Sequence, residues 1–238
     1  MAALQEAKML DARERIALAR SVLAQAEAAH GTTVRSLGVP VLPVVDELAP
    51  LLPGGGLRCG AVTVLEGSTS LLLTLLSRAT QEGAWCAVVG FPALGSLAAF
   101  ETGVELSRLA LIPDPGQQVG QVLATLVDGI DLVVVGPEVT TRHLNPSTQR
   151  QISARVKERG AVLISMNPWQ GAQQTLQAQV SGWQGLGQGH GYLTKQDLLL
   201  GRGGRGAHSP HVGRVSDSGQ RQIWAQVSLP LEVASAAF

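Results

Sequence analysis

The turn around Gly67 has residue types that suit phosphate binding. It lies between a β-branched run and an apolar helical segment, in residues 62–72 (VTVLEGSTSLL). In nucleotide-binding proteins, backbone N–H groups at the start of such a helix hold the phosphates, a Lys reaches the β- and γ-phosphates, and a Ser or Thr hydroxyl holds Mg²⁺. Ser68, Thr69 and Ser70 provide hydroxyls, but three small residues are too few for a G-x-x-x-x-G-K-[ST] loop.

The charges near this turn also oppose nucleotide binding. No Lys occurs between Arg58 and Arg78, so the turn has no cation for a phosphate. Glu66 places a negative charge where phosphate would approach, and like charges repel. We therefore predict a degenerate loop that holds no cofactor.

A second part of the hydrolytic machinery is replaced in the run Asp131–Val135. In nucleotide-hydrolysing proteins, the end of such a strand provides an Asp that holds the metal. Here Gly136 occupies the terminal position, and Asp131 begins the strand, which places it at the opposite edge of the sheet. Glu138 is the nearest carboxylate after the strand and is the alternative ligand. With two parts of one mechanism missing, we predict that the chain is not an enzyme.

Other catalytic or metal-binding patterns are incomplete. His190, His208 and His211 have no Cys or carboxylate pair beside them to complete a zinc site, so no metal is expected. Ser68 and Ser70 follow a strand as a nucleophile would, but the G-x-S-x-G pattern is absent. A hydrolase is therefore not expected.

Length and composition indicate a globular chain of the cytoplasm. The 238 residues are 45% hydrophobic and 15% charged, and they contain no apolar run long enough for a membrane span and no apolar signal segment. Cys59 and Cys86 stand apart and are predicted to be free thiols in a reducing compartment. Residues 31–150 hold six basic and ten acidic side chains, whereas residues 151–238 hold eight basic and four acidic ones. The imbalance favours an interaction surface in the C-terminal third.

Short apolar strands alternate with helical segments through the middle of the chain. This alternation predicts an α/β fold with a mainly parallel sheet and flanking helices. The strands are predicted at Ala61–Leu65, Ala84–Val89, Leu109–Ile112, Asp131–Val135 and Ala161–Met166. The helices are predicted at Leu71–Ala79, Leu94–Leu106, Pro115–Asp128 and Pro146–Arg159.

The pattern changes after Asn167, where Gly and Gln become frequent. Segments such as Gln222–Leu229 alternate polar with apolar residues, which predicts antiparallel hairpins added to the sheet or lying beside it. Trp169, Trp183 and Trp224 are expected in the core or on strand faces, and one of them is a candidate partner anchor. We divide the chain into an N-terminal helix and linker (1–40), a degenerate core (41–170) and a β-rich extension of the same domain (171–238).

Residues 3–29 predict one helix with a narrow apolar stripe. Met9, Ile16 and Leu23 recur every seven residues. Two interpretations remain open, because such a helix packs either on its own domain or on a partner protein.

The order of these pieces resembles the RecA family, whose fold this resemblance implies. It covers roughly residues 45–170. The pieces correspond to the Gly-rich lead-in to the phosphate-loop strand, a helix followed by a turn, the metal strand and a strand that ends in a polar sensor residue. In chain order, they are Leu51–Gly60, Phe100–Leu109, Asp131–Thr141 and Val162–Asn167.

Within RecA-like proteins, the chain looks most like the ImuA-prime and ImuA/SulA group, which includes actinobacterial mutasome accessory proteins. The features behind this are the missing nucleotide motifs, the Gly/Trp-rich piece Trp183–Gly187 and the Gly-Arg piece Gly201–Gly206. The resemblance implies a non-catalytic adaptor in damage-induced mutagenesis, during the SOS response and translesion DNA synthesis. It also implies binding to ImuB, an inactive Y-family polymerase relative, and indirectly to an error-prone C-family DNA polymerase. Nucleoid association during DNA damage follows from that role.

The extensions offer candidate contacts with a partner or with DNA. Arg202 and Arg205 lie in a Gly-rich segment, with Arg214 and Trp224 downstream. Arg-Gly segments contact DNA phosphates in other proteins; the alternative here is a solvated hairpin loop between strands Leu198–Leu200 and His211–Val215. Two other functions stay open, namely a SulA-like inhibitor that binds the tubulin-like division protein and a working ATPase with an unusual loop.

Overall fold

A computed structural model describes residues 40–139, 143–186, 191–204, 213–215 and 221–230. The chain divides into two compact units, Met1–Pro40 and Val41–Phe238, and the fold below is that of the second. The predicted contacts at Met9, Ile16, Leu23 and Arg205 lie outside the described residues. At Arg214 and Trp224, the structure describes the backbone alone.

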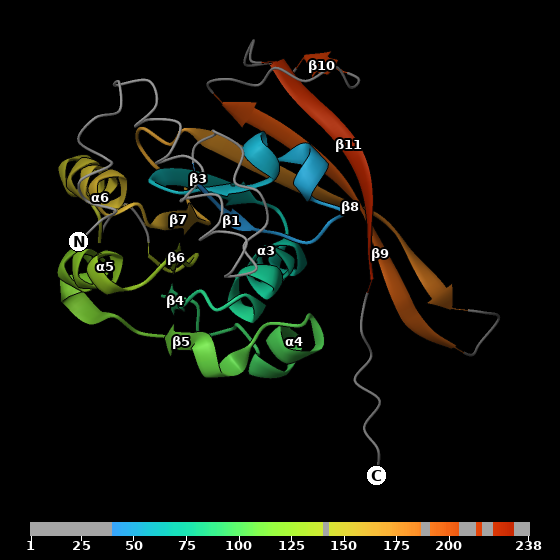
Figure 1. The fold of residues 1–238 in the computed structure, drawn as a ribbon, viewed down its shortest axis with the longest axis horizontal. Coiled ribbons are helices and arrows are strands. Elements are labelled where there is room, and N and C mark those ends of the chain that lie inside the picture. The colour runs from blue at the N-terminus through green and yellow to red at the C-terminus, as the bar shows by residue number, and fades with distance from the viewer. Residues whose placement is uncertain (1–39, 140–142, 187–190, 205–212, 216–220, 231–238) are drawn as a thin grey trace, which may run out of the picture. The chain divides into compact units, whose positions relative to one another are not determined.

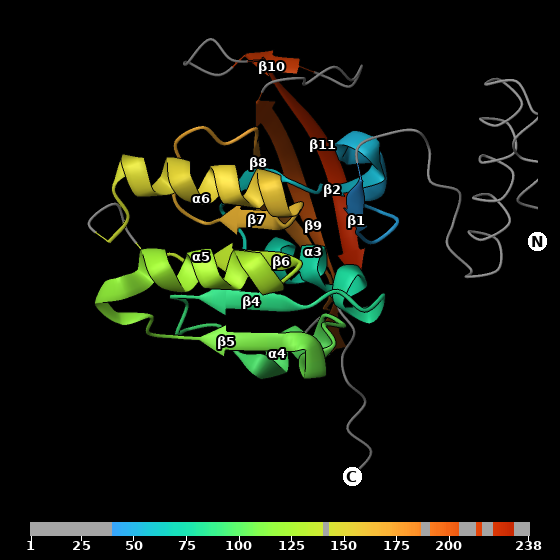
Figure 2. The same ribbon diagram turned by 60° about the vertical axis from the view of Figure 1, so that its left-hand side comes forward.

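A nine-stranded mixed sheet forms the centre of the described part of the second unit (Figures 1 and 2). Its order is β10-β11-β9-β8-β3-β7-β6-β4-β5, and the six strands from β8 to β5 run parallel. The parallel strands are β3 (Ala61–Glu66), β4 (Cys86–Val89), β5 (Leu109–Ile112), β6 (Leu132–Val135), β7 (Val162–Ser165) and β8 (Gln174–Leu186). The antiparallel strands are β9 (Gly191–Gly204), β10 (Gly213–Val215) and β11 (Arg221–Pro230). A separate two-stranded sheet joins β1 (Val41–Pro43) to β2 (Gly56–Arg58).

Helices cover both faces of the parallel strands (Figures 1 and 2). One face carries α3 (Thr69–Gln81) and α4 (Ser96–Glu101), and the other carries α5 (Val119–Gly129) and α6 (Pro146–Arg159). Because successive strand residues point to opposite faces, Leu132 and Val134 pack in the core with α3, whereas Val133 and Val135 pack with α5 and α6. All four are buried, which explains why the strands read as continuous apolar runs.

The structure confirms the predicted α/β class, with its mainly parallel sheet and antiparallel addition. Two details of the prediction are wrong. The segment predicted as the helix Leu94–Leu106 forms the shorter α4, because Gly103 takes a left-handed φ of +85° after its end. The strands predicted at Leu198–Leu200 and His211–Val215 do not pair with each other, because β11 lies between β9 and β10. Among the described helices, none is long and apolar enough to cross a membrane.

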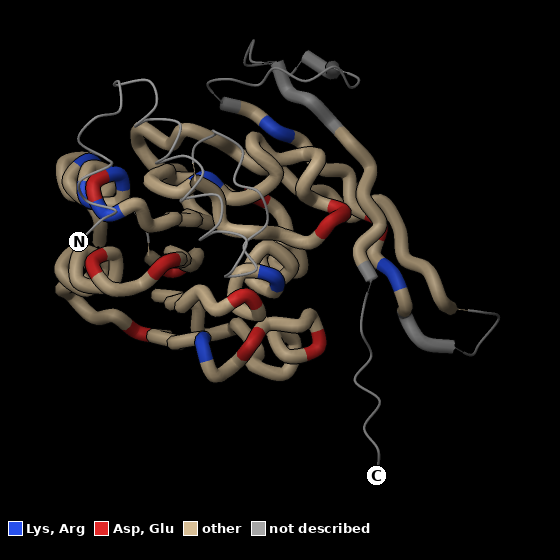
Figure 3. Tube along the Cα trace, in the orientation of Figure 1, with Lys and Arg blue, Asp and Glu red and all other residues tan. Residues whose placement is uncertain are grey.

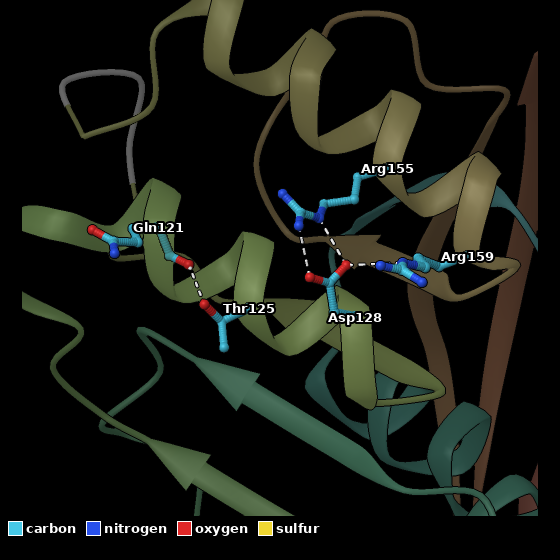
Figure 4. A network of polar contacts seen from close by, with 5 residues as sticks. All are labelled: Gln121, Thr125, Asp128, Arg155 and Arg159. Carbon is cyan, nitrogen blue, oxygen red and sulfur yellow. Dashed lines mark hydrogen bonds and ion pairs between the residues drawn. The ribbon is translucent and has the colours of Figure 1, made fainter.

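The carboxylate of Asp128 on α5 binds two arginines of α6, an arrangement that we call the clamp (Figure 4). Asp128 accepts two hydrogen bonds of 2.7 Å from the Arg155 guanidinium, and Arg159 Nε donates a third at 3.1 Å. The hydrogen bonds from Arg155 first, and the positive charges of both arginines, hold the pKa of Asp128 below its ordinary value. The clamp therefore favours the folded state while Asp128 is ionised.

We expect Asp128→Asn to lower the melting temperature at neutral pH. The folded-state pKa is lowered, so the stabilisation is present above the unfolded pKa and is lost as the pH falls through the folded one. The difference from wild type, measured by thermal unfolding across acidic pH, should therefore shrink as the pH falls. Glu47→Gln, at an exposed carboxylate, is the control and should show little effect. A difference that stays constant at every pH would contradict the clamp.

Candidate functional site

The turn after β3 is where a nucleotide phosphate would bind, and it has only two residues, Gly67 and Ser68. The helix α3 starts at Thr69, two residues earlier than the sequence predicts, so the turn is shorter still than expected. Ser68 is buried, and its Oγ accepts a hydrogen bond of 3.1 Å from the backbone N–H of Leu71. The helix start is thus capped by the chain itself, and one N–H group that could hold a phosphate is already bonded.

The neighbouring strand β8 closes this turn from the side. Gly67 has a φ of +94°, and a Cβ built on it would lie 2.2 Å from the backbone oxygen of Ala178. The carboxylate of Glu66 accepts a hydrogen bond of 2.7 Å from Gln177 Nε2. The described basic residue of α3, Arg78, lies in its last turn and pairs with Glu82, far along the helix from the turn. The turn therefore presents a carboxylate and a backbone carbonyl.

At the end of β6, where the sequence comparison with RecA-like proteins predicts a lost metal ligand, backbone atoms pack closely. The N–H of Gly136 donates a hydrogen bond of 2.7 Å to the oxygen of Val89. A Cβ at Gly136 would lie 2.4 Å from the oxygen of Gly90 and 2.6 Å from the Cβ of Phe91. An Asp at this position has no room unless the loop after β4 moves. Asp131 lies at the amino end of β6, where its Oδ2 accepts a 2.8 Å hydrogen bond from the N–H of Trp85.

Asn167, the polar residue that follows β7, forms hydrogen bonds with the segment after β6. Asn167 Nδ2 lies 3.1 Å from the oxygen of Gly136, 3.0 Å from that of Pro137 and 3.0 Å from that of Val139. An amide has two N–H donors, so it satisfies these three carbonyls through shared bonds. Its side chain therefore fixes the segment after β6. Sequence reasoning placed Asn167 at a sensor position but missed this structural role.

Glu138, the alternative ligand, is exposed beside a hollow of about 280 Å³ at the carboxyl ends of β4, β5 and β6. Asp114 and His143 line the same hollow. Asp114 Oδ1 already accepts a hydrogen bond of 2.9 Å from the N–H of Gly116. Among the described residues, no group of three or more His, Cys, Asp or Glu is arranged to hold a metal ion.

The predicted contact residue Arg202 lies on β9, half-buried, and its Nη1 donates a hydrogen bond of 3.2 Å to the oxygen of Leu51. Burial lowers its pKa. The predicted core role of Trp169 is confirmed, since it is buried and its Nε1 donates to Ser153 Oγ at 2.8 Å. Trp183, in contrast, is 49% exposed on β8. DNA contact by Arg202 stays a prediction.

Comparisons with known proteins give a family for this chain. The MT3502 N-terminal domain family matches residues 50–171, which is more than half of the chain. The chain is also similar to the uncharacterized protein Rv3395c of Mycobacterium tuberculosis, with 42% identity over 137 residues. That alignment covers 56% of this chain and 66% of the relative, just under two thirds of its length.

The molecule is thus an α/β protein in which the backbone of β8 packs against the turn between β3 and α3. Its matched segment runs from just before β2 through β7 and holds both Gly67 and Gly136. The chain belongs to the MT3502 N-terminal domain family.

We expect Gly136→Ala to destabilise the protein by about 1–3 kcal/mol, because the added methyl group meets Gly90 and Phe91. Gly129→Ala is the matched control, since a Cβ there has nothing within 4 Å. Ala is also the better helix former, so this control should be neutral or stabilising by up to about 1 kcal/mol. Chemical denaturation of both variants measures the difference. Equal stabilities for the two variants would show that the end of β6 has room for a side chain.

Proposed function

We propose that this chain is a non-catalytic, RecA-like adaptor of damage-induced mutagenesis that binds an ImuB-like inactive relative of Y-family polymerases. The observation that carries the non-catalytic part is the close backbone packing at both nucleotide positions. Ala178 occupies the space beside Gly67, and the segment of Gly90 and Phe91 occupies the space beside Gly136. Nucleotide hydrolysis needs a cation cradle and a metal ligand at these two places.

The order of the strands supports the RecA-like assignment. The resemblance assigns β3 to the phosphate loop, β6 to the metal ligand and β7 to the sensor residue. The strand β7 lies between the other two, and all three run parallel, so their carboxyl ends meet at one edge of the sheet. The carboxyl edge of an open α/β sheet is where ligands usually bind. In this chain, the carboxyl ends of β3, β6 and β7 lie at the same edge, and neighbouring backbone packs beside Gly67 and Gly136 there.

A binding role suits a chain that exposes large apolar side chains. Apolar groups on the surface are a common feature of protein–protein contacts when they cluster. Among the described residues, Val180, Trp183 and Leu186 expose their side chains on one strand, β8. The pathway itself, with its indirect link to an error-prone C-family DNA polymerase and its place in the cytoplasm at the damaged nucleoid, rests on the resemblance.

Co-purification of the full chain with the ImuB-like protein of the same genome, from cells exposed to DNA damage, tests this function. We expect a stable complex, and we expect loss of damage-induced mutagenesis when the gene is deleted. In a Gly136→Asp variant, the frequency of damage-induced mutation should follow the amount of folded protein in the cell. This variant should not gain the ability to hydrolyse ATP. The proposal is contradicted if the ImuB-like protein does not bind. Filamentous cells on overproduction, with unchanged mutation frequency, would instead favour the SulA-like inhibitor.

A further inference from the structure

The strand β8 extends beyond the strand that it pairs with in the parallel sheet. β3 pairs with Gln174–Gln177 and ends at Glu66. β8 continues to Leu186 and is paired on one side with β9 (Figure 1). Among the described residues, no strand pairs with the other side of Gln179–Leu186. We call Gln179–Leu186, together with residues 191–197 of β9, the distal ribbon.

The open edge of the distal ribbon has no charged side chain and exposes three large apolar ones. Val180 is 42% exposed, Trp183 49% and Leu186 65%. All of β8 lacks Asp, Glu, Lys, Arg and Pro, and its described trace is tan in Figure 3. Proteins usually protect an open edge with charges, prolines or bulges. β8 has two bulges, between Val180 and Gly182 and between Gln184 and Leu186, but neither of the other two devices.

Hydrogen bonds around Asp197 on β9 hold the distal ribbon in shape. Gln184 Nε2 lies 3.1 and 3.0 Å from the two carboxylate oxygens of Asp197, and the hydroxyl of Ser228 on β11 also donates to this carboxylate. Ser181 Oγ donates to the backbone oxygen of Asp197 at 3.1 Å. The bonds from Gln184 and Ser228 lower the pKa of Asp197. A ribbon that is already ordered loses less entropy when a partner binds.

The residue opposite Trp183 has an unmet hydrogen-bonding need. Gln196 pairs with Trp183 across the ladder, so both side chains lie on the same face of the ribbon. Gln196 is only 2% exposed, and its Oε1 has no hydrogen-bond partner among the described residues. A buried acceptor without a donor is unfavourable. Because Gln196 is buried, Trp183 is the member of this pair that a ligand can reach.

We propose that the distal ribbon binds an extended, uncharged segment of the ImuB-like partner, which adds as a strand along the open edge of β8 with Trp183 as its apolar anchor. The identity of the partner rests on the proposed function. The open backbone edge fits an extended polypeptide, which pairs through main-chain hydrogen bonds and places alternate side chains on each face. Nucleic acid is a poorer occupant, because phosphate binding needs cations. β8 has no Lys or Arg, and Lys195 on β9 lies two residues from the carboxylate of Asp197.

Affinity measurements with the full chain and the ImuB-like protein test the ribbon. Trp183→Ala should raise the Kd at least about 30-fold, as expected for a Trp at the centre of an interface. Two leucines of equal exposure give a matched pair, Leu186 at 65% on the ribbon and Leu97 at 66% on α4. Leu186→Lys should weaken binding, because it places a charge on the edge, whereas Leu97→Lys should leave the Kd unchanged. Melting temperatures close to that of the wild type would show that all three variants fold.

Amide hydrogen exchange of the wild-type chain, measured with and without the partner, tests the ribbon without any substitution. Strand addition should slow the exchange of amides in residues 179–186 when the partner is bound, and amides of α6 should exchange as before. A complex in which residues 179–186 are not protected and Trp183→Ala binds normally overturns this inference but leaves the proposed function intact. A homodimer that depends on Trp183 also overturns it, because the occupant would then be a second copy. Absence of any complex contradicts the proposed function itself.

Discussion

The fold depends on the close approach of β8 to the turn that joins β3 to α3. The backbone oxygen of Ala178 would lie 2.2 Å from a Cβ on Gly67, and Gly67 has a φ of +94°, so both the space and the backbone conformation require a glycine there. The same contact starts the part of β8 that continues past β3. This packing lies beside the turn to which the RecA resemblance assigns a phosphate, and beyond it β8 continues as the ribbon.

A similar constraint acts at the end of β6. Gly136 allows the segment after β4 to pack against β6, and Asn167 then ties the following carbonyls together. These contacts engage three backbone carbonyls and the Asn167 amide in bonds within the chain. The carboxyl edge of the sheet is thus stabilised by internal hydrogen bonds. The binding surface that we propose is instead the uncharged open edge of the ribbon.

The sequence predicts much of this architecture, because buried parallel strands are continuous apolar runs and their order along the chain limits the topology. It also identifies the short turn after Gly67, which has no Lys, and Gly136, in place of an Asp, as departures from the RecA-like pattern. It does not predict that β10 pairs with β11, since alternation of polar and apolar residues does not specify which strands pair. Nor does it predict the length of β8 beyond β3, the buried Gln196 or the bonds of Asn167, because these depend on contacts between distant segments.

The claim that nucleotide has no place beside Gly67 is tested most directly by nuclear magnetic resonance of the full chain during titration with Mg-ATP. Our account predicts no saturable chemical-shift change at the backbone amides of residues 67–71, up to millimolar nucleotide. Saturable shifts at these amides, lost on substitution of Gly67, would contradict it and would show that the turn still binds phosphate.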